Sequence, residues 1–314
     1  FSTGNNLLSI GGDGRNNQIF LATWIAKQNI QKNVDHVTFY AVEEPEAHLH
    51  PHQQRKLSTY IQEKFGEQIF ITTHSLHIAA KFTPANILRL YTLKKKTYAA
   101  SGGCSDILKE VFENFGYRMN ALSAECFFAS GVFLVEGVSE VLFYTALSNA
   151  INVDLDRLNI TILSVEGVGF KPYIAVCDAL NIPWVMRTDN DVFAKPSKKP
   201  EKNYYAGVSR IMGILSQIEN ADNELIQYWA EHNKENEWAY KTKPTTQAIG
   251  LNKYIRENII SYGIYLSNVD LETDLAQSSL YAILKKYYGK RTESSLVKAM
   301  QKYKAKNMMN FLSE

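Results

Sequence analysis

The sequence predicts an α/β protein made of two consecutive units, each with parallel strands joined by helices. In the first, short apolar runs at Val37–Val42 and Gln68–Thr73 flank a helical stretch at Gln53–Lys64, which is a strand, helix, strand order. After Ser101-Gly102-Gly103, a second alternation of apolar runs and helical segments begins at Val132. Because parallel strands need crossover connections, this alternation indicates a parallel sheet with helices on its faces.

The second unit is predicted from segments that alternate between strand-like and helix-like character. In order, they are Val132–Val135, Ser139–Asn149, Ile160–Val165, Lys171–Leu180 and Trp184–Arg187. A polar, mostly helical insertion is expected at about 203–259. One further strand, Gly263–Leu266, precedes a helical tail.

The glycine-rich interruption at 101–103 marks the predicted domain boundary. We expect a first domain at 1–103 and a second domain at 130–314. A helical linker at 104–129, with helices around Ser105–Phe115 and Asn120–Ala129, is expected between them.

Composition excludes several classes of protein. The chain has 314 residues, 45% of them hydrophobic, and a formal net charge of +2. It contains no run of roughly 18 or more apolar residues that could cross a bilayer. Its three cysteines, Cys104, Cys126 and Cys177, form neither a CxxC pair nor an even framework. We therefore expect a globular, cytoplasmic protein with no membrane partner, whose basic clusters at 94–96, 195–202 and 285–291 are mostly solvated faces.

Two neighbouring acidic residues end the first predicted strand. Glu43 and Glu44 follow Val37–Val42 directly, and the next predicted strand ends in His74-Ser75. Carboxylates at the carboxyl end of a buried parallel strand lie where ligands of open α/β sheets bind. One of the pair can hold Mg²⁺ while its neighbour orients an attacking water. A Glu-Glu pair is also typical of a solvated turn, so the pair alone leaves both readings open.

A glycine-rich segment before the first predicted helix adds to this pattern. It reads Ser9-Ile10-Gly11-Gly12-Asp13-Gly14, and such a turn at a helix N-terminus offers backbone N–H groups to phosphate. Together with the run Glu43–Pro51 and Thr72–Ser75, it resembles the signature, Walker B, D-loop and switch-histidine motifs of SMC-like ABC ATPases. The resemblance implies the C-terminal lobe of such an ATPase, with an ATP site formed by Ser9, Gly12, Asp13, Gly14, Glu43 as metal-side acid, Glu44 as catalytic acid and His74 as switch.

One part of an ATP site is missing from the sequence. No Gly-x-x-x-x-Gly-Lys-[Ser/Thr] motif occurs, and Gly289-Lys290 lacks the first glycine. The lysine of that motif and its loop cradle the β- and γ-phosphates. We therefore expect that this chain alone does not hydrolyse ATP and that the N-terminal ATPase lobe lies outside it.

The histidines permit a different interpretation. His48, His50 and His52, with His74 and His77, are a set that could ligate zinc in a metal-dependent hydrolase that uses no ATP. The Glu-Glu-Pro context already accounts for the first three, so this interpretation is kept as the lesser alternative.

A second set of carboxylates follows the strands of the second unit. Glu136 ends the strand Val132–Val135, Glu140 lies one helical turn later, and the strand at Trp184–Arg187 leads into Thr188-Asp189-Asn190-Asp191. In an alternating sheet these strand ends can lie side by side, which would gather Glu136, Glu140, Asp189 and Asp191 around one cavity. Carboxylate oxygens without imidazole or thiolate suit Mg²⁺ or Mn²⁺, and two such ions support phosphodiester cleavage.

These residues resemble the Toprim motif over roughly Gly131–Val192, including a small-residue turn at Glu166–Gly169. Two later segments resemble motifs of the OLD family of nucleases. Leu266–Leu275 resembles its Asp-Leu-Glu segment, which implies Glu272 as a further metal-side carboxylate. Gln301–Met308 resembles its terminal lysine motif, which implies Lys304 as the cation that stabilises the scissile phosphate, with Lys306 and Lys302 as fallbacks.

The resemblance to the OLD family covers nearly the whole chain. Within that family, the motif residues of this sequence are most similar to those of the nuclease subunits of Gabija anti-phage systems. It implies metal-dependent cleavage of double-stranded DNA in which Glu136, Asp189, Asp191 and Lys304 are catalytic. It further implies ATP as a regulator, a homo-oligomer formed through the ATPase regions, and a UvrD-like helicase partner. The principal alternative is a DNA-binding ATPase scaffold that does not cut.

Overall fold

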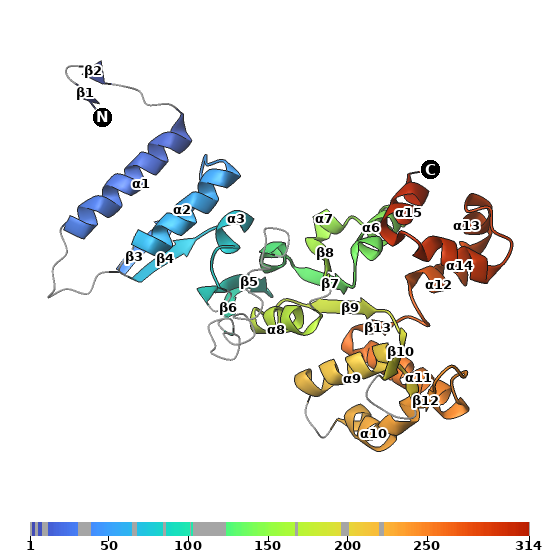
Figure 1. The fold of residues 1–314 in the computed structure, drawn as a ribbon. Coiled ribbons are helices and arrows are strands. Elements are labelled where there is room, and N and C mark those ends of the chain that lie inside the picture. The colour runs from blue at the N-terminus through green and yellow to red at the C-terminus, as the bar shows by residue number, and fades with distance from the viewer. Residues whose placement is uncertain are drawn as a thin grey trace. The chain divides into compact units, whose positions relative to one another are not determined.

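The computed structural model describes residues 2–3, 6–7, 12–30, 39–64, 68–83, 86–100, 102, 124–166, 169–195, 201–219 and 223–313. The chain divides into two compact units, residues 1–128 and residues 129–314. Figure 1 shows the helices and strands, and the predicted α/β class with parallel sheets is confirmed. The predicted helix Ser105–Phe115 lies outside the described residues, and the described end of the one predicted at Asn120–Ala129 contains a 3-10 helix, Glu125–Phe128 (η4).

The first unit is built on two parallel strands covered by helices. Its elements are β1 (Ser2–Thr3), β2 (Asn6–Leu7), α1 (Asp13–Ile30), β3 (Phe39–Glu43), α2 (Pro51–Lys64), β4 (Gln68–Thr72), α3 (Leu76–Ala79), β5 (Arg89–Leu93) and β6 (Lys96–Ala100). β3 pairs with β4 in parallel, with Phe39 opposite Gln68. The core residues are Leu21, Leu49, Leu57 and Ile61, with Val42, Ile69 and Ile71 packed against them. Because side chains alternate along a strand, Phe39 and Phe70 lie on the other face and are exposed.

The hairpin β5–β6 was not predicted from the sequence. Its two-residue turn is Lys94-Lys95, and both residues have positive φ, 48° and 62°. Two-residue hairpin turns need such angles and usually use Asn or Gly. Because lysine is not typical of such positions, the turn could not be recognised from the sequence. Two residues of the basic cluster at 94–96, Lys94 and Lys95, therefore form a hairpin turn.

The second unit contains a four-stranded, all-parallel sheet in the order β13-β9-β7-β8. Its strands and crossover helices are β7 (Gly131–Val135), α6 (Val138–Ala150), α7 (Leu155–Leu158), β8 (Ile160–Ser164), α8 (Lys171–Ala179), β9 (Trp184–Thr188) and β13 (Ile264–Leu266). The predicted strands and helices of this sheet match these within one or two residues. Buried apolar strands are readable because both faces of a parallel sheet are covered.

The insertion between β9 and β13 is mostly helical, as expected for about 203–259, and it also includes three short strands. Its elements are β10 (Val192–Lys195), β11 (Lys202–Tyr205), α9 (Ala206–Ile218), α10 (Glu224–His232), η5 (Asn233–Asn236), β12 (Glu237–Ala239), α11 (Thr246–Asn258) and η6 (Ile259–Tyr262). The three strands form an antiparallel sheet in the order β10-β11-β12. Strands of three or four residues are too short to show the alternation that sequence reading depends on.

The chain ends in four helices, which confirms the expected helical tail. They are α12 (Leu271–Ala276), α13 (Tyr281–Tyr287), α14 (Glu293–Gln301) and α15 (Lys304–Leu312). They enclose an apolar cluster that includes Leu284, Leu296, Met300 and Met308, and Phe143 of α6 belongs to the same cluster. The tail is thus packed onto the first helix of the parallel sheet. Within the described residues, no helix is long and apolar enough to cross a membrane.

Candidate functional site

The carboxyl ends of β7 and β9 bring two acidic residues together. β7 and β9 are neighbours in the sheet, so Glu136 after β7 and Asp189 after β9 lie at the same edge. The backbone N–H of Asp189 donates to Glu136 Oε1 at 2.9 Å, and the Thr188 hydroxyl donates to the same oxygen. A direct hydrogen bond therefore joins these two predicted site residues in the structure.

The other predicted acids of this site come from three different segments. Glu140 lies in the first turn of α6 and is only 5% exposed. Asp191 ends the acidic segment Asp189–Asp191 and is partly buried. Glu272 lies in the first turn of α12 and is 2% exposed. Four of the five predicted carboxylates thus belong to the sheet edge and its first helix, and the fifth is delivered by the tail.

The tail holds Glu272 and Lys304 in place through Asp270. The Asp270 carboxylate caps α12 by accepting from the Thr273 N–H at 2.8 Å, and it also accepts from Gln301 Nε2 at 2.6 Å. Gln301 ends α14, and Tyr303 then adopts a φ of 116° before α15 begins at Lys304. This sharp turn after Gln301 fixes the start of α15 beside α12.

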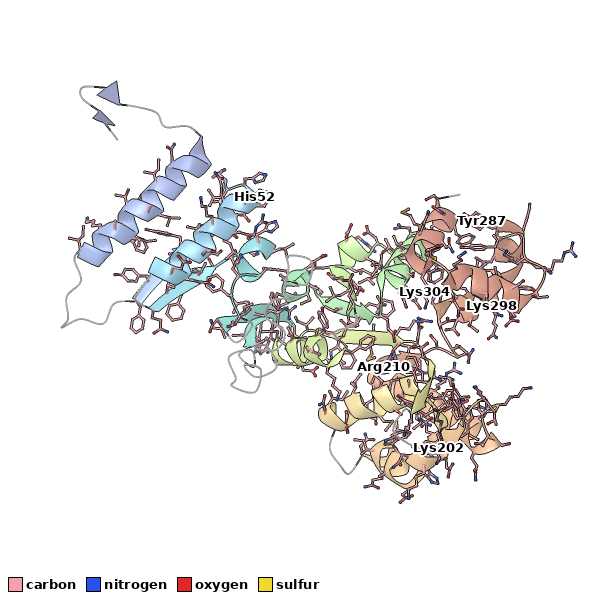
Figure 2. All side chains as sticks on the ribbon, in the orientation of Figure 1. His52, Lys202, Arg210, Tyr287, Lys298 and Lys304 are labelled. Carbon is pink, nitrogen blue, oxygen red and sulfur yellow. The ribbon has the colours of Figure 1, made fainter. Side chains whose placement is uncertain are left out.

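Lys304 pairs with carboxylates from two of these segments. Its Nζ lies 3.3 Å from Glu272 Oε2 and 3.7 Å from Asp189 Oδ2. The two fallback lysines are placed differently, because Lys302 lies over the ring of Tyr303 and Lys306 is exposed. Figure 2 labels Lys304 at the start of α15. Of the three lysines, Lys304 is the one that the structure brings to the acidic residues.

A buried arginine that the sequence reading missed binds the same cluster. Arg187 lies on β9, its side chain is 7% exposed, and its Nη1 is 3.3 Å from Asp189 Oδ1 and 3.9 Å from Glu140 Oε1. Its Nη2 is 3.0 Å from Asp274 Oδ2 and also contacts the Ser267 hydroxyl. Both terminal nitrogens of Arg187 are thus engaged. A charged residue inside an apolar strand was the available signal, since a buried charge must be paired.

A second arginine was also missed, and it comes from the insertion. Arg210 lies on α9, and its Nη1 contacts Glu136 Oε1 and the Thr188 hydroxyl. Its side chain is 30% exposed. Nothing in the local sequence distinguishes Arg210 from a surface arginine, because its partners are more than twenty residues away along the chain.

Burial and repulsion between neighbouring carboxylates raise the pKa values of four of the acids. Burial, reinforced by Glu136, raises the pKa of Asp189 to about 7, although Arg187 and Lys304 act to lower it. Burial also raises the pKa values of Glu140, Asp191 and Glu272 above their ordinary ranges. For Lys304, burial alone would lower the pKa, but Glu272 and Asp189 raise it. Such coupled shifts are typical of functional sites.

The donor set fits a hard divalent cation in its chemistry. Carboxylates supply the oxygen atoms, and these are the ligands that Mg²⁺ and Mn²⁺ prefer. In the geometry described, however, no group of three or more His, Cys, Asp or Glu side chains among the described residues converges in a metal-binding arrangement. The carboxylate oxygens are directed instead at Arg187, Arg210 and Lys304.

The predicted small-residue turn at 166–169 follows β8, next to the same edge. The Glu166 N–H donates to the Glu136 carbonyl at 3.2 Å, which ties this turn to the end of β7. Gly169 has a φ of 90°, a conformation that favours glycine. Gly167 and Val168 lie outside the described residues.

The acids of the first unit lie at the end of β3. Glu43 is the last residue of that strand, and Glu44 follows with a φ of 41° while its N–H donates to the Thr72 carbonyl at 3.0 Å. His74 Nε2 lies 3.7 Å from Glu44 Oε1, with both side chains exposed. The structure thus brings the predicted catalytic acid and the predicted switch histidine together.

The glycine-rich segment begins α1. A Cβ on Gly14 would lie 2.1 Å from the His48 carbonyl oxygen, so only glycine permits this close approach of α1 to the loop after β3. Among the described residues, no atom lies within 4 Å of the corresponding position on Gly12. Asp13 is the first residue of α1, and Ser9 lies outside the described residues.

The histidines of the zinc interpretation are spread over several contacts. The rings of His50 and His52 stack with centroids 5.3 Å apart. His52 Nδ1 and His77 Nδ1 lie 2.7 Å and 3.3 Å from the two terminal nitrogens of Arg55. In the part of the chain that the structure describes, these histidines form no group of three metal ligands.

Comparison with known proteins finds two domain families that match segments of this chain, one in each unit. The model of the "Overcoming lysogenization defect protein-like, TOPRIM domain" matches residues 127–191, and the model of the "AAA ATPase domain" matches residues 8–79. Endonuclease GajA of Bacillus cereus is 26% identical over 98% of this chain and 52% of its own length. The OLD nuclease of Thermus scotoductus is 30% identical over 51% of this chain and 32% of its own length.

The chain spans about half the length of the first of these relatives and about a third of the second. Among solved structures, the C-terminal region of the Burkholderia pseudomallei OLD protein is 21% identical, with a TM-score of 0.43 over 59% of this chain and 88% of its own. The corresponding region of the Xanthomonas campestris pv. campestris OLD protein is 22% identical, with a TM-score of 0.35 over 60% of this chain and 79% of its own.

Proposed function

We propose that this chain, which is similar to OLD-family nucleases and contains segments that match an ATPase and a TOPRIM domain, is a metal-dependent endonuclease that cuts double-stranded DNA. The observation that carries the proposal is the meeting of Glu136 and Asp189 at neighbouring strand ends, with Lys304 3.7 Å from Asp189. Both acids lie within the segment, residues 127–191, that matches the TOPRIM domain.

The acidic residues would hold the metal. Glu136, Asp189 and Asp191 are the proposed ligands, helped by Glu140 and Glu272. Bound Mg²⁺ or Mn²⁺ would make water a stronger nucleophile at neutral pH and neutralise charge on the phosphate. The raised pKa of Asp189 fits this role, because a crowded, buried set of carboxylates gains most from a cation that lets all of them ionise.

Lys304 is the proposed phosphate-stabilising cation. Its Nζ lies beside Asp189 and Glu272, and 45% of its side chain is exposed, so the side chain lies between the acids and solvent. Negative charge accumulates on the phosphate oxygens during in-line displacement, and a fixed cation beside them lowers the barrier. Arg187 has a positioning role, because it holds Asp189 while its other nitrogen is bound to Asp274.

The first unit is proposed to regulate cleavage through ATP. Glu43, Glu44 and His74 would act at the nucleotide with the glycine-rich segment Ser9–Gly14, and a lobe with a P-loop would complete the site. We further propose, from the resemblance to Gabija nuclease subunits, a homo-oligomer formed through the ATPase regions, a UvrD-like helicase partner, a cytoplasmic location and a role in anti-phage defence. Suppression of cleavage by ATP, and suppression that persists longer in Glu44→Gln because ATP would bind without being hydrolysed, would support the regulatory part.

A plasmid cleavage assay tests the nuclease. Full-length protein would be incubated with supercoiled plasmid in Mg²⁺ or Mn²⁺, with and without ATP, and compared with Asp189→Ala, Glu136→Ala and the control Asp156→Ala, an exposed acid on α7. We expect both site variants to lose at least about a hundredfold in cleavage rate, while Asp156→Ala keeps the full rate. Thermal melts of all variants establish that they are folded.

The alternatives predict other results. If the unchanged chain binds DNA but cuts none in either metal, the DNA-binding scaffold is correct and the nuclease proposal is wrong. If cleavage requires stoichiometric zinc and is lost when His50 and His52 are replaced, the zinc interpretation replaces the present one. Cleavage that survives in Asp189→Ala and Glu136→Ala places the active site elsewhere.

A further inference from the structure

The insertion is attached directly to the acidic segment Asp189–Asp191. The Ala206 N–H donates to the Asp191 carbonyl at 2.8 Å, and Asn190 Nδ2 donates to Asn252 Oδ1 of α11 at 3.0 Å. A Cβ on Gly207 would lie 2.5 Å from the Asp189 carbonyl oxygen and 2.7 Å from the Asn190 Cα. The first turn of α9 therefore rests on the backbone of the acidic segment, with glycine at the point of closest approach.

This packing places Arg210 over the site. Arg210 lies three residues after Gly207, and residues at this spacing share one face of a helix. Its Nη1 contacts Glu136 and the Thr188 hydroxyl. Among the described residues, the hydrogen bonds of Arg210 all use Nη1, and 30% of its side chain is exposed. By contrast, Arg187 is 7% exposed and uses both terminal nitrogens in internal contacts.

Arg210 and Lys304 approach the acids from different parts of the fold. Arg210 comes from the insertion and pairs with Glu136, whereas Lys304 comes from the helical tail and pairs with Asp189 and Glu272 (Figure 2). Each cation neutralises a different acid and remains partly open to solvent. A polyanion that reached the acids would meet one cation from each of the two segments.

We propose that Arg210 is a DNA-binding residue whose guanidinium contacts a backbone phosphate beside the one that is cut. This inference rests on the proposed nuclease function. A guanidinium presents five N–H donors in a planar fork that matches phosphate oxygens. Nη1 can remain on Glu136 while the other guanidinium nitrogens bind the phosphate. The insertion thereby acquires a function, because it carries a substrate contact and is locked to the acidic segment that it serves.

A simpler role for Arg210 is that of a counter-ion that only keeps Glu136 in place. The Glu136→Gln background separates the two roles, because it removes the ion pair and the proposed cleavage together. If replacing Arg210 still weakens DNA binding in this background, the loss reflects a direct contact between Arg210 and DNA, because the ion pair with Glu136 is already absent. In the same background, the stability that a pure counter-ion supplies is already lost.

The experiment measures binding of full-length Glu136→Gln protein to a labelled DNA duplex at several salt concentrations between about 50 and 200 mM. The same protein is compared after adding Arg210→Gln, Arg210→Lys or the control Lys253→Gln, an exposed lysine of the insertion. Each phosphate contact contributes about 0.9 to the slope of log K against log salt. We expect Arg210→Gln to reduce the slope by about 0.9, and the other two to leave it unchanged.

The outcomes distinguish this inference from the proposed function. If the unchanged chain cuts DNA but Arg210→Gln keeps the parental slope, the inference is wrong and the nuclease stands. If Lys253→Gln reduces the slope as much as Arg210→Gln, binding is diffuse and the inference is equally wrong. If the unchanged chain neither cuts nor binds DNA, the proposed function is wrong and the inference with it. Should Arg210→Gln melt early, a reduced slope in Arg210→Ala that Arg210→Lys restores decides in favour.

Discussion

At the residue scale, the site is a set of buried and partly buried acids held by protein cations and by hydrogen bonds from the backbone and from neighbouring side chains. Asp189 is held by Arg187 on one side and Lys304 on the other, yet burial and Glu136 still raise its pKa to about 7. The opposing charges therefore do not fully offset the cost of burying the carboxylate. Functional sites often keep such a cost, and a bound divalent cation is what would relieve it here.

The raised pKa of Asp189 predicts how stability depends on pH in the metal-free protein. The folded-state pKa lies above the ordinary value of 3.8, so the folded protein binds the proton more tightly than the unfolded chain. This contribution to stability is complete below about pH 4 and is lost as the pH rises through about 7. Asp189→Asn stays neutral and avoids the loss.

We therefore expect Asp189→Asn to melt at the same temperature as the unchanged chain near about pH 4, and higher by at least about 2–4 °C near about pH 8. The measurement is a series of thermal melts in the presence of a chelator. Parallel melting curves at every pH would contradict the assignment. Added Mg²⁺ should raise the melting temperature of the unchanged chain and leave that of the variant unchanged.

At the element scale, the insertion packs against the end of the parallel sheet through the contact between α9 and the acidic segment Asp189–Asp191. It depends on the absence of a side chain at Gly207, where a Cβ would meet two backbone atoms at 2.5 and 2.7 Å. Backbone cannot move aside as a flexible side chain can. An added methyl group must therefore lift the start of α9 and displace Arg210 from Glu136.

Gly207→Ala is expected to destabilise the protein by about 1–3 kcal/mol, the usual cost of overpacking, and to lower DNA cleavage. Gly213→Ala on the same helix is the matched control, because a Cβ there would meet, within the part of the chain that the structure describes, Lys171 Nζ alone, at 3.9 Å. This control should be stabilised by up to about 1 kcal/mol, since alanine favours a helix interior over glycine. Denaturant unfolding of both variants provides the comparison, and equal effects on stability would rule out the proposed contact.

At the scale of the whole molecule, each unit has a core made from its own residues. The first unit encloses Leu21, Leu49, Leu57 and Ile61, with strand residues packed against them. The second unit has a four-stranded parallel sheet and an apolar cluster shared by α6 and the tail. The second unit also contains every described residue of the proposed nuclease site.

Residues 129–314 are therefore expected to fold without the first unit. A separate polypeptide of this length should unfold in one cooperative transition on heating, because its parallel sheet and the apolar cluster described above are both made of its own residues. Circular dichroism during heating measures this. A gradual, non-cooperative loss of signal would show that the second unit needs the first. If the folded fragment also cuts plasmid in a manner insensitive to ATP, nucleotide control belongs to the first unit.

The sequence by itself determined the α/β class and the strands that end in acidic residues. Apolar runs such as Val132–Val135 mark strands buried on both faces, and the residues that follow them must lie at the carboxyl edge of the sheet. The places of Glu136 and Asp189 at that edge follow from this local pattern. The same pattern did not show the short strands of the insertion or the Lys94-Lys95 hairpin turn.

Only the tertiary structure decided which cations face the acids. Arg210 reaches Glu136 because Gly207 lets α9 rest on the acidic segment, and Lys304 reaches Asp189 because the tail packs on α6. Arg187 meets Asp274 across 87 positions of the chain. Apolar periodicity records which residues leave water, and it is local. The pairing of distant charges depends on how whole helices pack, which no short stretch of sequence contains.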